Sequence, residues 1–376
     1  MKKISLVLIM LFFGLAFSQP PSGSKSLLHT QSARTFESGR LEVHTNMNFF
    51  TRATEFIGKG QKPADFSAVN YWLVSSNLAL TYGILDNLDF TIAPRLYQDT
   101  HAKNEYNLPG DVFFTLKGGS FAFAGRRMYG ALMATIRLGT GEEHNYPFTE
   151  YASGATEYAF TGALSYYMDP YLPDRSFSAH LNLGWWNHNE AGQELYKGKP
   201  TSSVNSSELQ YALGFVYPTE LFDYQLELFG SSFLTKPDEI VYSREDYFYV
   251  TPSIRYKPMS WISMDLGMDI RISADKDETM GVPDKSPADF NLPNYSSWKV
   301  HMGLNVKLLP FTSVKKTPAE VERDQFQERV KFFQKIVEDR KKAEDVQEQL
   351  DRLKEERKEA EKELEELKQI MEEEAE

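Results

Sequence analysis

The chain has 376 residues, a formal net charge of -12 and no cysteine. The absence of cysteine excludes a disulfide framework, a thiolate metal site and the cysteine of a lipoprotein anchor. The negative charge argues against nucleic acid as a partner, because binding to a phosphate backbone needs a basic surface.

The first residues predict export from the cytoplasm. Lys2 and Lys3 precede an apolar run over 4–17, and Ala16 and Ser18 have the spacing that signal peptidase accepts. We therefore expect a signal peptide over residues 1–18. An uncleaved anchor is the alternative, although the apolar run is short for a spanning helix. Residues 19–39 then form an N-terminal segment that lies in the periplasm or plugs a barrel.

Alternation of apolar and polar residues predicts twelve strands of about 9 to 15 residues, long enough for tilted strands to cross a bilayer. The predicted strands cover residues 40–51, 69–82, 88–98, 110–118, 128–138, 154–168, 176–188, 206–217, 222–234, 246–257, 261–273 and 296–309. The pattern predicts an all-β fold, a 12-stranded antiparallel transmembrane outer-membrane β-barrel over residues 40–311.

The connections between these strands alternate in length. Those after even-numbered strands are mostly short, such as 83–87 and 258–260, with 119–127 the longest. Those after odd-numbered strands are long and polar. Outer-membrane barrels have this arrangement, with turns on the periplasmic side and loops outside. A soluble β-sandwich has no reason to separate its connections in this way.

Each predicted strand has one apolar and one polar face. In the strand 88–98, Leu88, Phe90 and Ile92 share a face, while Asp89 and Thr91 lie on the other. Alternation alone also fits the core of a large soluble β-protein. Unbroken apolar faces, 14% aromatic residues and aromatic residues near strand ends favour lipid outside and a polar lumen inside.

The segment "LTYGILDNLDFTIAPRL", followed by "LPGDVFFTLKGG", resembles the transporter-like outer-membrane barrels of the phenol-degradation pathway, MetA-type, family. The resemblance covers residues 40–311. It implies a transport role and brings no catalytic residues. The matching positions are Tyr82, Gly83, Asp86, Leu88, Asp89, Gly110, Asp111 and Lys117.

The inward faces carry charges of both signs, so the lumen is not biased toward anions or cations. These charges either pair and fill the lumen, or line a water-filled path. No motif fixes a catalytic geometry, and we predict no enzyme activity, cofactor or metal site. The predicted lumen-lining residues are Arg95, Lys117, Arg137, Glu157, Glu227, Arg255, Asp265, Asp269, Arg271 and Lys299.

The last part of the chain, residues 312–376, predicts a long periplasmic helix. Thr317, Pro318 and Glu320 form a helix start, and neither proline nor glycine follows. A heptad pattern indicates a coiled coil with itself or a partner, whereas abundant Glu and Lys also fit a single solvated helix. The predicted seam residues are Leu350, Leu353, Ala360, Leu364, Leu367 and Met371.

Together these features predict a channel or transporter in the bacterial outer membrane for passive movement of small polar or amphiphilic solutes. Its expected partners are outer-membrane lipid and, through residues 317–376, a second copy or a periplasmic protein. The alternative is a structural anchor with a closed lumen, which presents the tail to a partner. An open lumen would favour the channel, and a filled lumen would favour the anchor.

Overall fold

The computed structural model describes residues 23, 25–54, 69–100, 105–107, 110–141, 144–145, 148–195, 201–280, 294–310 and 318–373. The chain divides into two compact units, one up to residue 312 and one from residue 313 onward. The predicted signal peptide, residues 1–18, lies outside the described residues.

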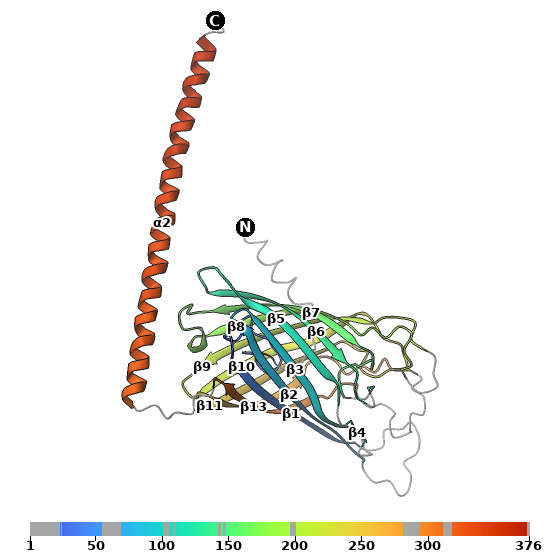
Figure 1. Ribbon diagram of the computed structural model, residues 1–376. Helices are drawn as coiled ribbons and strands as arrows, with labels where there is room; N and C mark the ends of the chain where they lie inside the picture. Colours follow the sequence, from blue (N-terminus) through green and yellow to red (C-terminus); the bar gives the residue numbers. More distant parts are fainter. Residues whose placement is uncertain are drawn as a thin grey trace, which may run out of the picture. The chain divides into compact units, whose positions relative to one another are not determined.

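Twelve antiparallel strands close into a β-barrel (Figure 1). Each pairs with its neighbours along the ring, and β1 pairs with both β2 and β13, which completes the closure. The ring consists of β1 (Leu41–Thr54), β2 (Val69–Leu85), β3 (Leu88–Thr100), β5 (Val112–Phe123), β6 (Met128–Leu138), β7 (Glu157–Tyr167), β8 (Ser178–Asn187), β9 (Ser207–Pro218), β10 (Phe222–Thr235), β11 (Tyr247–Met259), β12 (Ile262–Arg271) and β13 (Trp298–Leu309).

Two short elements lie in the connections. The strand β4 (Glu105–Asn107) pairs with the far end of β3 and is not part of the ring. A 3-10 turn, η1 (Pro173–Arg175), lies between β7 and β8. The short connections gather at one end of the barrel and the long ones at the other, because an antiparallel ring reverses direction at every strand.

The sequence prediction of twelve ring strands is confirmed, and all but one of the observed strands begin and end within three residues of the prediction. The exception is β5. We predicted a connection over 119–127, whereas the strand continues to Phe123 and leaves a turn of four residues. The pairing of β5 with β6 shifts between Gly118 and Phe121, and this irregularity interrupts the alternation from which the strand end was predicted.

The distribution of apolar and polar side chains in the barrel is the reverse of that in a water-soluble protein. Leucine, isoleucine, phenylalanine and methionine side chains are exposed on the outer face, and Leu132 reaches 73% exposure. The inner face buries charged and polar side chains, including Asp89, Glu157 and Asp269. An exposed apolar surface that encircles a whole barrel is stable only where lipid covers it.

Aromatic side chains border this apolar face at the two ends. Tyr82, Tyr217 and Tyr256 are exposed near the short turns. Tyr158 and Trp185 pack edge to face near the long loops, with ring centroids 5.8 Å apart. Tyrosine and tryptophan favour the two interfaces of a bilayer, because their rings are apolar and their OH or NH groups are polar.

In its described residues, the second unit consists of one helix, α2 (Pro318–Glu373), of 56 residues. The helix carries pairs at i and i+4, such as Arg340 with Glu344 and Arg357 with Glu361, which support an isolated helix. The predicted cap, Thr317, lies outside the described residues. In the part of the chain that the structure describes, no helix is both long and apolar enough to cross a bilayer.

Candidate functional site: the barrel lumen

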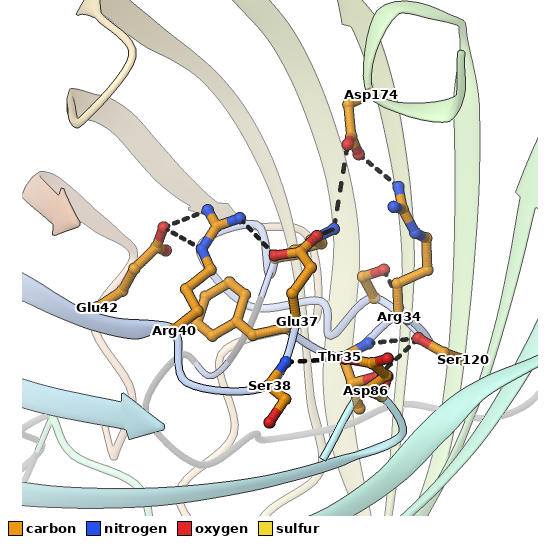
Figure 2. Close-up of polar contacts among 12 residues, drawn as sticks. Arg34, Thr35, Glu37, Ser38, Arg40, Glu42, Asp86, Ser120 and Asp174 are labelled. Atoms are coloured by element: carbon orange, nitrogen blue, oxygen red, sulfur yellow. Dashed lines mark hydrogen bonds and ion pairs between the residues drawn. The ribbon is translucent and has the colours of Figure 1, made fainter. Parts of the chain in front are cut away.

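Residues 25–40, here called the plug segment, run inside the barrel instead of pairing as a strand. At the end with the short turns, side chains of the segment bind the turns themselves (Figure 2). The Arg34 guanidinium lies 2.5 Å from Asp174 in the connection between β7 and β8. The Thr35 hydroxyl donates to the backbone oxygen of Asp86 between β2 and β3.

Deeper in the lumen, inward-facing side chains bind the backbone of the plug segment. The Glu227 carboxylate on β10 accepts the backbone N–H groups of Leu28, His29 and Thr30, at 3.0, 2.9 and 2.6 Å. The Asp89 carboxylate on β3 accepts the N–H of Phe36 at 3.0 Å. A chain without regular secondary structure leaves its backbone groups unpaired, so these carboxylates supply the partners that a sheet would otherwise give.

Cationic and amide side chains of the wall satisfy the carbonyl groups of the same segment. Lys117 donates to the backbone oxygen of Arg34 at 2.9 Å. Arg255 donates to that of Ser26 at 3.0 Å, and Asn182 to that of Gln31 at 2.7 Å. The segment is therefore bound by a set of polar contacts that is specific to its course through the barrel.

Glycine residues in the wall allow the plug segment to approach. A Cβ atom at Gly214 would lie 3.1 Å from the Cβ of Thr30, and one at Gly119 would lie 2.7 Å from the backbone oxygen of Ala33. The contact at Gly119 is too short for any side chain, and the one at Gly214 would force the segment to shift by a few tenths of an ångström. The close contact between the segment and the wall thus depends on the small size of these positions.

At the opposite end, the long loops fold together over the lumen. Phe148 forms a bridge with Tyr295, and its N–H donates to the backbone oxygen of Asn294 at 2.7 Å. The Tyr295 hydroxyl donates to the backbone oxygen of Ser243 at 2.7 Å. The loops after β6, β10 and β12 are joined by these contacts.

A cavity of about 90 Å³ lies between the plug segment and the folded loops. Leu28 and His29 line the cavity on one side, and residues 148–151 line it on the other. Its lining combines cationic Arg95, Arg137 and Lys299 and acidic Glu150 and Glu208 with aromatic rings of Phe113 and Trp186. A space of this size and polarity holds several water molecules.

The predicted lumen residues all lie on ring strands, and each has a charged or hydrogen-bonding partner. Arg137 pairs with Asp111 at 2.6 Å and with Glu157 at 3.5 Å. Arg255 pairs with Asp265 at 2.6 Å. Arg271 pairs with Asp275 at 3.1 Å and donates to the backbone oxygen of Tyr295. Lys299 lies 3.8 Å from Asp269.

The structure thus divides the ten predicted residues by what they contact. Three of them, Glu157, Asp265 and Arg271, pair with other residues of the wall and loops. Lys117, Glu227, Arg255 and Asp269 bind the plug segment. Arg95, Arg137 and Lys299 line the cavity. The Arg95 guanidinium also lies over the Phe113 ring, 5.8 Å from its centroid.

Sequence reasoning missed one arrangement of potential ligands. His29, Asp269 and His301 come together in the lumen, although they lie far apart in the sequence and on three separate segments. Predicting the inward face of His301 was possible from alternation, whereas His29 lies in a segment without periodicity. Its position depends on the course of the plug segment, for which the sequence offers no local signal.

The predicted coiled-coil seam is only partly described. Leu350, Leu353 and Ala360 are exposed on α2. The side chains of Leu364, Leu367 and Met371 lie outside the described residues.

A closed ring of twelve antiparallel strands, an apolar exterior and a polar interior define the class of protein: an outer-membrane β-barrel. No family model matches the sequence, and no curated protein matches it.

Solved structures with a similar barrel include the NanC porin, at 10% sequence identity over 71% of this chain and 100% of that one, with a TM-score of 0.45. An outer-membrane channel from Pseudomonas putida F1 is 8% identical over 73% of this chain and 97% of its own, with a TM-score of 0.44. The toluene transporter TbuX of Ralstonia pickettii is 8% identical in sequence, with a TM-score of 0.35. The match covers 78% of this chain and 99% of TbuX.

Proposed function

We propose that the protein is an outer-membrane channel for passive movement of small polar or amphiphilic solutes. The observation that supports this most strongly is the cavity inside an inverted barrel: the lumen combines a polar wall with space that side chains do not fill. A barrel that serves only as an anchor gains nothing from such a space.

The plug segment makes movement through the barrel conditional. It occupies the part of the lumen beside the short turns, so a solute passes only when residues 25–40 shift or leave. Their contacts are polar, and water can replace polar partners once the segment moves. We therefore propose that the plug segment controls passage.

The cavity lining supports the choice of solute class. Guanidinium and ammonium groups of Arg95, Arg137 and Lys299 offer hydrogen-bond donors, while Phe113 and Trp186 offer apolar surface. Such a mixed lining suits a small molecule that has both a polar group and an apolar part. The resemblance of residues 40–311 to MetA-type barrels, carried by the motif positions between Tyr82 and Lys117, fits the same proposal.

The alternative function is an anchor that presents α2 to a periplasmic partner. One observation favours it: the paired charges and the plug segment fill part of the lumen. In this proposal α2 lies in the periplasm and associates through Leu350, Leu353, Ala360, Leu364, Leu367 and Met371 with a second copy or another protein.

Conductance in planar bilayers separates the two proposals. We would compare the refolded mature protein with variants that lack residues 19–40 or 313–376. A channel gives discrete steps that become more frequent without residues 19–40, persist without the tail and change in size in Arg95→Gln. An anchor remains silent in all forms while it still migrates as a folded, heat-modifiable barrel.

A further inference from the structure

Three side chains with metal-binding atoms meet where the plug segment contacts the wall. His29 belongs to the plug segment, Asp269 to β12 and His301 to β13. The Nε2 atom of His29 lies 2.8 Å from Oδ1 of Asp269, and the Nε2 atom of His301 lies 2.7 Å from Oδ2. One atom from each residue can be chosen so that all three lie within 4.8 Å of one another.

The contact between His301 and Asp269 is close but is not a well-formed hydrogen bond. Oδ2 of Asp269 and Nε2 of His301 are buried and have no hydrogen-bond partner of acceptable geometry among the described residues. Two buried polar atoms that meet at 2.7 Å without a well-aligned hydrogen bond are only partly compensated for their lost hydration. A cation bound by both atoms would give each of them a partner, once the two atoms have moved slightly apart.

Neighbouring groups hold the three side chains in orientation. The His29 ring stacks on Phe229, with centroids 3.8 Å apart. It meets the His301 ring edge to face at 5.0 Å. The Thr251 hydroxyl donates to Oδ1 of Asp269 at 2.7 Å. Support of this kind from outside the ligand set is typical of metal sites, where it fixes the ligands before the ion arrives.

We propose that His29, Asp269 and His301 bind a divalent transition-metal ion, with Zn²⁺ as the best match. Two imidazole nitrogens and one carboxylate oxygen suit zinc, whereas Mg²⁺ and Ca²⁺ prefer ligand sets made of oxygen. Zinc bonds of about 2.0–2.2 Å keep any two ligand atoms within about 4 Å. Binding would therefore bring the most separated ligand atoms closer by less than about 1 Å, and would move each imidazole nitrogen slightly away from the carboxylate oxygen that it contacts.

The proposed ion would join the plug segment to the barrel wall. Of the three ligands, His29 alone belongs to the segment, so coordination couples the ion to the plugged state. The Lys299 ammonium, 3.8 Å from Oδ2 of Asp269, opposes a second positive charge and sets a limit on affinity.

The test measures metal binding to the full mature chain, purified without a histidine tag and folded in detergent. Competition with a chelating dye should show one tight Zn²⁺ site per chain, and Co²⁺ should give the visible absorption bands of nitrogen ligation. In His29→Gln and in His301→Gln we expect affinity to fall roughly 100-fold or more, since each removes a direct ligand. Neither readout depends on conductance, so the result is independent of the proposed channel.

Two further variants make the result specific. His44→Gln changes another histidine that lines the cavity but is not part of the cluster, and it should bind Zn²⁺ like the parent protein. Lys299→Gln should bind Zn²⁺ more tightly, because the opposing charge is gone. Heat modifiability on gels confirms that each variant is folded. The proposal is overturned if the parent binds no stoichiometric Zn²⁺, or if folded His29→Gln and His301→Gln bind it as tightly as the parent.

Discussion

Glu227 provides the densest set of contacts between the wall and the plug segment. Its buried carboxylate accepts three consecutive backbone N–H groups, from Leu28, His29 and Thr30. Hydrogen bonds to a charged group contribute about 1.5–3 kcal/mol each, more than neutral ones. This residue should therefore have a strong influence on whether the segment stays in the lumen.

We predict that Glu227→Gln loosens the plug segment. The amide has one acceptor oxygen and no charge, so we expect the segment to lose about 2–3 kcal/mol of stabilisation. Hydrogen exchange over residues 25–37, followed by mass spectrometry, should become faster by roughly 30-fold or more. Glu220→Gln, in an exposed turn, is the matched control and should leave exchange unchanged. Equal protection in both variants would contradict the assigned role of Glu227.

Glu37 gives the turn end of the plug segment a dependence on pH. Partial burial would raise the pKa of its carboxyl, but nearby Lys25, a hydrogen bond to its own backbone and Arg40 outweigh this and lower the pKa to about 2. The ordinary value is about 4.5. The ionised form is thus favoured in the folded state, so its contribution is complete above pH 4.5 and is lost as the pH falls toward 2.

We predict that the turn end of the segment becomes mobile in acid. The chain has no cysteine, so Ser38→Cys allows a single nitroxide label whose mobility can be measured by electron paramagnetic resonance. Mobility should rise between pH 4.5 and 2. The rise should be smaller when Glu37→Gln is added, because the titrating group is absent. The size of the effect is limited, since the Glu37 side chain is 61% exposed and water screens its ion pairs.

At the scale of the elements, alternation in the sequence was sufficient to predict the ring strands. Each ring strand has lipid on one side and a polar lumen on the other, so the sequence pattern and the structural pattern have the same period. The prediction fails where this period is interrupted. The end of β5 follows a shift in pairing at Gly118, and β4 is too short to show a period.

The helix α2 could be predicted for a different reason. It contains no proline or glycine after Pro318, and its residues are strong helix formers. A second helix that covers Leu350 and Leu353 would come from a partner. Helix propensity does not predict such a partner, and the structure of one chain does not contain it.

We predict that the tail associates through its C-terminal heptads. Leu350→Asp combined with Leu353→Asp should shift sedimentation of a peptide with residues 318–376 from oligomer to monomer, because it places charge in the predicted seam. Arg340→Asp combined with Glu344→Lys, which changes charges outside the seam, should preserve the oligomer. If the parent peptide is monomeric at high concentration, self-association is contradicted. The tail is then a solitary helix or a helix that pairs only with another protein.

At the scale of the whole molecule, the inverted distribution of side chains implies a surrounding lipid phase. Leu266 on β12 and Leu353 on α2 have similar exposed fractions, 57% and 64%. Their environments differ if β12 faces lipid and α2 faces water. Leu266→Arg should destabilise the barrel in lipid vesicles by about 2–4 kcal/mol, as measured by urea unfolding. Leu353→Arg should leave barrel stability unchanged, and equal effects would argue against a lipid-facing outer surface.

The contacts inside the lumen could not be predicted from the sequence. Alternation identifies inward residues such as Glu227 and Asp269, since it depends only on neighbours in the same strand. Their partners come from residues 25–40, which lie up to 240 positions away and have no repeating pattern. The cavity likewise depends on contacts between loops that lie far apart in the sequence. Long-range polar contacts of this kind need the folded chain.

A reversible link between Thr30 and Gly214 tests the central claim, that the plug segment controls a channel. A Cβ at Gly214 would lie 3.1 Å from that of Thr30, and a disulfide needs about 3.5–4.5 Å, so the link forms once the segment moves away from the wall by about half an ångström; the chain has no other cysteine. Single-channel recordings of the Thr30→Cys, Gly214→Cys double variant should be silent when oxidised and show discrete openings after reduction, while each single variant responds to neither treatment. Conductance that is the same in the oxidised and reduced forms would contradict a gating role for the segment, and silence in every form would contradict the channel itself.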